Sequence, residues 1–349
     1  MKVKGMGITF DDVLLVPQKS SIASRDDVIL ETHLTPKIRL AVPLVSANMD
    51  TVTESGIAIE VAKVGGIGII HRFLTIKREV EEVSLVKAEG FLVGAAIGIK
   101  EDHMERASAL IDAGCDVLII DIAHGHSIFL LKVLENLKKK FKKTEIIAGN
   151  VATSLAAKDL IEAGADAIKV GIGPGAMCST RIVAGAGVPQ LTAIADCAAI
   201  ASKHNIPVIA DGGIRYSSDI VKALGAGAST VMIGTLLAGC KESPSTAFFQ
   251  NGEKYKLVRG MASLHASQER QKVTKDIAKK DLSNYTEEGV SAVVRYKGSA
   301  EPVLLQLIGG MRSGFSYSGA RNIAELWKKA EFIQISRNGL TESHPRMEG

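Results

Sequence analysis

The sequence predicts an α/β fold, a (β/α)8 barrel with a mobile flap inserted after its eighth strand, and three observations point to it. One pattern occurs four times: the end of a helix, then Gly, then a run of apolar residues typical of strands, then a polar residue or Gly. The four repeats are residues 60–71, 110–121, 160–171 and 222–234. Further apolar runs of the same kind alternate with them, at 41–47, 91–98, 144–150 and 206–213. Uninterrupted apolar runs are typical of strands buried on both faces of a parallel sheet.

Amphipathic stretches separate the apolar runs, which is the third observation. We expect helices at about 53–64, 76–88, 101–113, 127–141, 153–163, 190–204 and 216–225, and a last helix at 321–330. The Gly that follows each helical part of the repeat suits a left-handed C-terminal cap. Eight strand–helix units favour one barrel domain over residues 1–349.

A doubly wound sheet is the alternative to the barrel. That fold binds dinucleotides through the pattern GxGxxG, followed by an acidic residue after the next strand. In this sequence GIGPG has its glycines at the wrong interval, and there is no Walker loop. The barrel is therefore the better prediction.

One long segment, residues 245–315, fits none of the strand–helix units. Its part 265–295 is polar and charged and follows the eighth predicted strand. A long polar excursion at the catalytic end of a barrel is typical of a mobile lid. Composition alone leaves a disordered insertion as the alternative.

The composition excludes several classes of protein. A net charge of +4, from 42 basic and 38 acidic residues, is too small and too dispersed for a nucleic-acid partner. No apolar run approaches the length of a membrane span, so we expect no membrane partner. The four cysteines form no CxxC pair, which indicates a reducing compartment, and we expect a cytoplasmic protein. Cys115, Cys197 and Cys240 lie in apolar or helical contexts and are predicted to be inert.

Polar residues and glycines follow nearly every predicted strand. In a barrel these positions meet at one face, where active sites lie. They are Ser46, Asn48, Met49 and Asp50; His71 and Arg72; Asp121, His124 and His126; Asn150; residues 171–181; Asp211, Gly212 and Gly213; and Gly234 and Thr235.

Cys178 is the candidate nucleophile. It lies in the segment GIGPGAMCSTR, residues 171–181, directly after a predicted strand. Backbone N–H groups of a glycine-rich loop can form an anion-binding concavity, and positive charge from nearby Arg181 favours the reactive thiolate. Alternatively, the carbonyls of Gly173, Gly175 and Cys178 can face inward and surround a cation.

Many sequence blocks, in order along nearly the whole chain, resemble the IMP dehydrogenase/GMP reductase family. They include FDDVLLVP (10–17), PLVSANMDTVTE (43–54), GGIGIIHR (65–72), IIDIAHGH (119–126), the cysteine loop, VIADGGIRYSSDIVKALGAGA (208–228), RGMASL (259–264) and ESHP (342–345). The resemblance implies an NAD(P)-dependent oxidoreductase that acts on a purine nucleoside monophosphate.

Two reactions are implied by the family. In the dehydrogenase the cysteine attacks C2 of IMP, hydride passes from C2 to NAD, and water hydrolyses the resulting covalent thioimidate to XMP. In the reductase the cysteine attacks GMP and expels ammonia, and NADPH then delivers hydride to give IMP. Both require a loop flexible enough to bring the thiol over the base, which explains the glycines before Cys178.

The resemblance also implies a role for individual residues. The catalytic residues would be Cys178, Thr180 and Glu288. The nucleotide would contact Ser46, Met49, Asn150, Asp211, Gly213, Gly234, Thr235, Met261 and Ala262. The dinucleotide would contact Asp121, Gly171 and Gly173. A potassium ion would be held by the carbonyls of Gly173, Gly175 and Cys178, together with Glu342, Ser343 and His344 of a neighbouring subunit. A homotetramer follows from such a shared site.

Three departures from the family pattern stand out. The two-CBS regulatory module that most dehydrogenases insert, here near residues 86–90, is missing. The flap lacks the usual Arg-Tyr pair, and Arg270 is displaced from that position. Ala176 and Val258 replace a serine and a tyrosine that usually bind the phosphate, and each lost contact is worth about 1.5–3 kcal/mol.

These departures leave three functions to compare. Most blocks, and the length of the flap, favour an IMP dehydrogenase without the regulatory module. The missing module and Arg-Tyr pair favour a GMP reductase. The altered phosphate and flap positions favour a purine-nucleotide-binding protein that has lost turnover.

Overall fold

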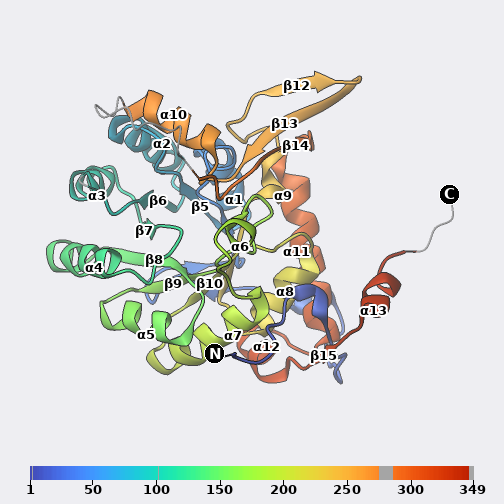
Figure 1. Cartoon of the computed structure of the whole chain (residues 1–349). Helices are drawn as coiled ribbons and strands as arrows, with labels where there is room; N and C mark the ends of the chain where they lie inside the picture. The colour runs from blue at the N-terminus through green and yellow to red at the C-terminus, as the bar shows by residue number, and fades with distance from the viewer. Residues whose placement is uncertain (2, 101, 275–285, 346–349) are drawn as a thin grey trace.

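Eight parallel strands close into a barrel at the centre of the protein, as expected (Figure 1). The computed structural model describes residues 1, 3–100, 102–274 and 286–345. The barrel strands are β4 (Leu44–Ser46), β5 (Ile67–Ile70), β6 (Val93–Ile97), β7 (Val117–Asp121), β8 (Glu145–Val151), β9 (Ala167–Val170), β10 (Val208–Asp211) and β11 (Thr230–Ile233). Each pairs with its neighbours in chain order, and β11 pairs with β4 to close the ring.

Helices form an outer layer around the strands (Figure 1). The first seven barrel helices lie at or close to their predicted positions: α1 (Ser55–Lys63), α2 (Ile76–Ala88), α3 (His103–Asp112), α4 (Ile128–Lys140), α5 (Ser154–Glu162), α7 (Gln190–Ala201) and α8 (Ser217–Gly225). Local sequence fixes several N-termini. The hydroxyls of Thr75, Ser127 and Thr153 accept backbone N–H groups from the first turns of α2, α4 and α5.

The prediction of a helix at 321–330 is confirmed, but its assignment as the eighth barrel helix was wrong. The helix that contacts both α8 and α1, and so completes the outer layer, is α11 (Ala300–Tyr317). The predicted segment does contain a helix, α12 (Ile323–Lys329), but it packs on α8. Gly309 and Gly310 made the sequence of α11 look like a loop, because glycine is a poor helix former.

The segment 245–315 is also more ordered than its composition indicated. Besides α11 it contains a three-stranded antiparallel sheet of β12 (Ala247–Gln250), β13 (Glu253–Arg259) and β14 (Ser291–Arg295), which projects from the barrel (Figure 1). Helix α10 (Leu264–Thr274) opens the predicted flap 265–295, and β14 ends it. Residues 275–285 of that flap lie outside the described residues.

A strand near the start of the chain pairs with a strand near its end, beside the barrel. Strand β1 (Val13–Leu15) pairs antiparallel with β15 (Phe332–Gln334). The 3-10 turn η1 (Phe10–Asp12) precedes β1, and the short helix α13 (Arg337–Glu342) follows β15. Another hairpin, of β2 (Thr32–His33) and β3 (Arg39–Leu40), packs Leu34 and Leu40 against apolar side chains inside the barrel.

Alternation along the strands decides which side chains face the barrel interior. On β4, Val45 belongs to the interior cluster, and Ala47, just past the strand, shares its direction. Ser46 is fully buried and lies next to Gly68, with the helical layer behind it. The same parity directs Asp121, Lys169 and Asp211 inward from β7, β9 and β10, next to interior residues two positions earlier.

The chain runs directly from α2 to β6 through residues 89–92. The regulatory module that the sequence predicts to be absent would lie near residues 86–90, at the end of α2 and the start of this connection. Among the helices of the described chain, none combines the length and the apolar character needed to cross a membrane.

Candidate active site

A cavity of about 500 Å³ opens at the carboxyl end of the barrel strands. Most of the predicted site residues line it, although they come from all around the barrel. They are Met49, Asp121, Asn150, Gly171, Gly173, Gly175, Cys178, Thr180, Asp211, Gly213, Gly234, Thr235, Met261, Ala262 and Glu288. Residues far apart in the sequence therefore form a single site.

Four predicted residues do not line this cavity. Ser46 is fully buried and its side chain belongs to the opposite face of β4, so its expected contact with the nucleotide was wrong; Ala47 lines the cavity instead. Glu342, Ser343 and His344 lie exposed at the end of α13, away from the cavity of their own chain. Their predicted role in a neighbouring subunit stays a prediction.

Cys178 begins a line of three hydrogen-bonded side chains. Its thiol donates to Oγ1 of Thr180 over 3.2 Å, and that hydroxyl donates to Oε2 of Glu288 over 2.9 Å. Cys178 is the exposed cysteine of the four, whereas Cys115, Cys197 and Cys240 are buried. A thiol, a hydroxyl and a carboxylate in this order can pass a proton away from, or back to, the sulfur.

Burial explains why the other cysteines are unreactive. It raises the pKa of Cys115 and of Cys197 to about 12 and that of Cys240 to about 11. These thiols hold their protons at neutral pH, and the thiolate is the reactive form. The prediction that they are inert agrees with this environment.

Backbone contacts hold the cysteine loop against the segment that carries Glu288. The N–H of Ser179 donates to the carbonyl of Glu288 over 2.9 Å, and that of Val290 donates to the carbonyl of Met177 over 3.0 Å. Gly171 is required at the start of the loop, because its φ is +152° and a Cβ atom there would lie 1.9 Å from the carbonyl oxygen of Asp211. These contacts set Glu288 beside Thr180 even though the residues are 108 positions apart.

Arg181 has a different role from the one predicted. Its guanidinium donates to the carbonyl of Val188 over 2.6 Å and lies along the backbone of the loop. The side chain that contacts the thiol is that of Thr180, and we correct the prediction accordingly. Arg181 therefore fixes the shape of the loop through its backbone.

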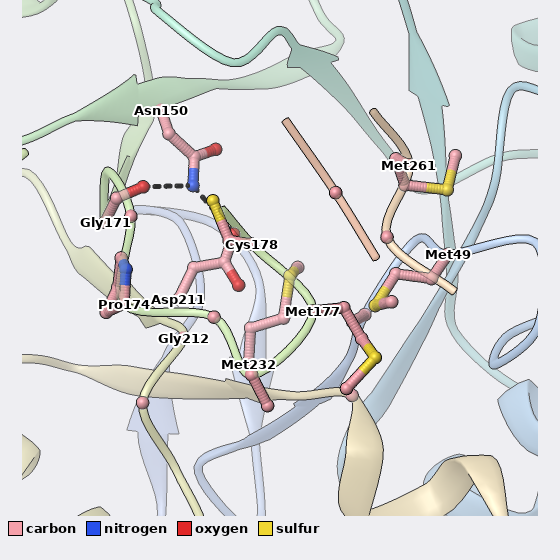
Figure 2. A pocket seen from close by; sticks show the side chains of 18 of the residues that line it. Met49, Asn150, Gly171, Pro174, Met177, Cys178, Asp211, Gly212, Met232 and Met261 are labelled. Carbon is pink, nitrogen blue, oxygen red and sulfur yellow. Dashed lines mark hydrogen bonds between the residues drawn. The ribbon is translucent and has the colours of Figure 1, made fainter. Parts of the chain in front are cut away.

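Methionines form an apolar wall opposite the polar part of the cavity. Met49, Met177, Met232 and Met261 all line it, and Figure 2 shows their side chains on the same side of Cys178. Thioethers adapt to flat apolar groups and interact favourably with aromatic rings. This wall suits a planar heterocycle next to the sulfur.

The polar part of the cavity centres on Lys169, which sequence analysis missed. Its ammonium lies 2.7 Å from Oδ1 of Asp121 and 2.8 Å from Oδ2 of Asp211, and it donates to the amide oxygen of Asn150. Asn150 in turn donates to Asp211 and to the carbonyl of Gly171, as the dashed lines in Figure 2 show. The signal was a lone charged residue at an inward position of an apolar strand, AIKV.

These charges set each other's ionisation. Burial disfavours a charged Asp121, but Lys169, Arg72 and the amide of Asn48 outweigh it and hold the pKa of that carboxyl below its ordinary value. Burial likewise disfavours a charged Lys169, but Asp121 and Asp211 outweigh it and raise the pKa of the ammonium. The lysine and Asp121 are therefore both charged at neutral pH.

The two residues that replace the family's usual phosphate contacts, Ala176 and Val258, have different surroundings. Ala176 lines the cavity and brings no polar side-chain atom to it. Val258 is fully buried in β13 and lies outside the lining. Two charged side chains of the lining, Asp11 and Arg215, form an ion pair with each other.

A second cavity of about 420 Å³ adjoins the first. Both are lined by Ala123, Ile172, Thr180 and Glu288. Ligands in the two cavities would therefore meet beside Thr180 and Glu288. This arrangement fits two ligands that react with each other, such as a nucleotide and a dinucleotide.

Backbone oxygens are the available ligands for a cation in the cysteine loop. In the described part of the chain, His, Cys, Asp and Glu side chains form no group of three or more arranged for a metal ion. The carbonyl of Gly175 accepts the N–H of Cys178 over 2.9 Å, which leaves its second lone pair available. Oxygen donors of this type suit a hard cation.

Comparisons with known proteins agree on one family. A family model described as "IMP dehydrogenase / GMP reductase domain" matches residues 7–346. The chain is 45% identical to inosine-5'-monophosphate dehydrogenase of Cryptosporidium parvum, over 97% of this chain and 95% of that protein. It is 35% identical to GMP reductase of Leishmania donovani, over 97% and 96%. The crystal structure of a cysteine-to-alanine variant of GMP reductase from Trypanosoma brucei, in complex with guanosine 5'-monophosphate, has a TM-score of 0.92 and 32% identity, with 99% of both chains covered.

Some relatives contain residues that have no counterpart in this chain. The alignment with the Leishmania protein spans 472 positions, at least 123 more than the 349 residues of this chain. The alignment with the Cryptosporidium protein spans only 383. The chain therefore lacks more than a hundred residues that the former relative contains.

Proposed function

Because this chain belongs to the IMP dehydrogenase/GMP reductase family, we propose that it oxidises IMP to XMP through a covalent adduct on Cys178. The observation that carries the proposal is the line from Cys178 through Thr180 to Glu288. A dehydrogenase must hydrolyse its adduct, and this line provides a base next to the carbon that water attacks. The higher identity to a dehydrogenase than to a reductase supports the same choice.

Cys178 starts the reaction and ends it. The thiol adds across the C2–N3 double bond of IMP, so that the sulfur bonds to C2 and its proton goes to N3. Hydride then leaves C2 for the NAD that would bind beside it, and N3 releases its proton, which leaves C2 bonded to sulfur as a thioimidate. Water adds to C2, its proton passes to Thr180 as Thr180 gives its own to Glu288, and the C2–S bond breaks. XMP and the free cysteine result, and one proton is released overall.

The remaining lining residues hold and orient the nucleotide. Asp211 and Asn150 offer side-chain oxygens for ribose hydroxyls, and the N–H groups at Gly213, Gly234 and Thr235 are suited to phosphate. The methionine wall accommodates the purine. We place the dinucleotide beside Asp121 and Gly171–Gly173, where NAD would supply the hydride acceptor. A potassium ion at the carbonyls of the cysteine loop would stabilise the loop's closed shape.

The decisive assay combines the purified protein with IMP and NAD and follows NADH. We expect turnover, and intact-protein mass spectrometry during the reaction should detect a nucleotide bonded to Cys178. Cys178→Ala should lower activity by about 10⁴-fold or more, while IMP affinity stays within a few-fold. Cys197→Ala is the matched control, because this thiol is buried and carries no role in the reaction. Full activity in Cys178→Ala would refute the proposal.

GMP reductase is the second candidate. The similarity to the Trypanosoma brucei reductase structure favours it, as does a flap sequence without an Arg-Tyr pair. In that reaction the same line would give a proton to the departing ammonia. NADPH oxidation that depends on GMP, with release of ammonia and no NADH from IMP, would assign the chain to this activity instead. Tight nucleotide binding without turnover in either direction would indicate the third function, a binding protein.

A further inference from the structure

We propose that Lys169 is a positioning residue that links the nucleotide side and the dinucleotide side of the cavity, by holding Asp211 and Asp121 with one ammonium group. The inference rests on the proposed function for the identity of the two sides. Neither the sequence motifs nor the shape of the cavity assigns a role to Lys169.

The geometry satisfies the ammonium completely. A lysine has three N–H donors, and three acceptors surround Nζ of Lys169: Asp121 at 2.7 Å, Asp211 at 2.8 Å and the amide oxygen of Asn150. These acceptors lie on β7, β10 and β8, so one side chain ties together three strands besides its own. Lys169 is 2% exposed, which keeps water from replacing any of the three.

The contact with Asn150 orients that amide as well. Because its oxygen faces Lys169, its NH₂ group faces Asp211 and the carbonyl of Gly171, at 2.8 and 2.9 Å. One cation thus fixes both carboxylates and the amide of Asn150, which Figure 2 shows beside Gly171 and Asp211.

The charges make this arrangement depend on Lys169. Both carboxylate oxygens lie within 2.8 Å of one nitrogen, so they are no more than about 5.5 Å apart, the sum of the two distances. Without the ammonium, two buried negative charges at that separation would repel each other. Arg72 also acts on Asp121. Its single positive charge would compensate only one of the two negative charges of Asp121 and Asp211. One carboxyl of the pair would then bind a proton and turn away from its ligand.

Lys169→Met tests this directly, since methionine keeps most of the side chain's volume. We expect IMP and NAD each to bind about 10-fold to 100-fold more weakly, whereas Asp211→Asn should weaken mainly IMP and Asp121→Asn mainly NAD. The IMP affinity of Lys169→Met should also vary with pH between 6 and 8 more strongly than the affinity of the parent protein, in which only the IMP phosphate changes its charge. Lys169→Arg, which keeps the charge, should recover part of the affinity.

The double variant Lys169→Met/Asp121→Asn separates charge from packing. It removes the second negative charge, so IMP should bind more tightly than it does to Lys169→Met, and the pH dependence of binding should return to that of the parent. If Lys169 only fills space, the double variant binds no better than the single one, and the proposal is wrong.

Thermal unfolding gives a readout that needs no nucleotide. In Lys169→Met the raised pKa of the pair makes the melting temperature fall more steeply than in the parent as pH rises from about 4, where aspartate ionises in unfolded chains. Asp121→Asn in the same chain should return the slope to that of the parent. Parallel melting curves for the single and double variants would overturn the role of Lys169. Failure of the proposed function appears elsewhere, in the parent protein, as absence of IMP oxidation.

Discussion

At the scale of single residues, position along a strand or loop decides which groups can react. Cys178 is exposed in a loop and hydrogen-bonded to Thr180, while burial keeps Cys115, Cys197 and Cys240 protonated. A thiol that can lose its proton and a partner that can take it are both needed for covalent chemistry. Of the four cysteines, Cys178 satisfies both conditions.

Glu288→Gln tests how the adduct is hydrolysed. The amide keeps the shape of the side chain but cannot accept the proton from Thr180. We expect IMP oxidation at steady state to fall about 10²-fold to 10⁴-fold, while the first turnover still releases one NADH per site. The Cys178 adduct should therefore accumulate, as measured by intact mass. Glu287→Gln, one residue away, is the control. An adduct that decays in Glu288→Gln as fast as in the parent would contradict the role.

Sequence reasoning found most of the site, and its errors have physical reasons. Residues that follow strands converge in any barrel, so Asn150, Asp211 and Cys178 could be placed together without coordinates. Ser46 was misplaced because the side of a strand depends on its register, which motif order does not reveal. Lys169 was missed because its apolar neighbours indicate a buried strand, whereas only the register of that strand shows that the lysine side chain faces the barrel interior.

At the scale of elements, close packing between α8 and α11 depends on glycine. A Cβ atom at Gly310 would lie 2.1 Å from Oγ of Ser217 in α8, whereas one at Gly309 would meet nothing within 4 Å. Seven barrel helices carry amphipathic patterns that sequence reveals. The eighth carries glycines whose purpose is visible only from the facing helix.

Alanine at these two neighbouring positions should have opposite effects. Gly309→Ala should stabilise the protein by up to about 1 kcal/mol, because alanine favours the helix. Gly310→Ala should destabilise it by about 1–3 kcal/mol, because α11 must move away from α8. Urea unfolding of both variants measures the difference. Equal effects would show that α11 is not held at the observed distance.

The contact between α2 and α3 should make stability depend on pH. Glu79 of α2 is fully buried against Arg106 of α3. Burial raises the pKa of Glu79 from 4.5 to about 8, although Arg106 opposes the shift. Between these values the unfolded chain loses a proton that the folded chain keeps, so the free energy of unfolding decreases as pH rises.

Glu79→Gln should remove this decrease. Compared between pH 5 and pH 8, the parent's free energy of unfolding should fall by about 1–4 kcal/mol more than that of the variant. Urea unfolding at the two pH values measures the difference. Glu81→Gln, on the exposed side of the same helix, should follow the parent. Parallel curves for parent and Glu79→Gln would indicate that the carboxyl stays ionised.

At the scale of the whole molecule, a single chain exposes several large apolar side chains to solvent. Ile128 and Phe129 at the start of α4, and Ile182 in the short helix α6 (Thr180–Val183), are 68%, 71% and 90% exposed. They lie where the helices begin, at the cavity end of the barrel. Exposed apolar groups beside a site are typical of contacts with a partner.

Together with the shared potassium site that the family resemblance implies, these exposed groups lead us to expect four copies to assemble, with a mass near 148 kDa, four times the 36.9 kDa chain. Light scattering after size-exclusion chromatography measures it. Ile182→Glu should shift the protein toward smaller species and lower its activation by potassium, if α13 of one copy completes the cation site of another. A stable monomer of full activity would contradict the assembly.

The pairing of β1 with β15 also determines when the protein can become active. Val13 lies opposite Gln334, which comes 321 positions later in the sequence. Contacts between residues so distant in sequence form late in folding. During synthesis, the side of the pocket that Phe10 and Asp11 form is not held in place until β15 has left the ribosome and paired with β1. Synthesis of β15 thus acts as the completion step, and a chain that stops before this strand should carry the cysteine but bind its nucleotide poorly.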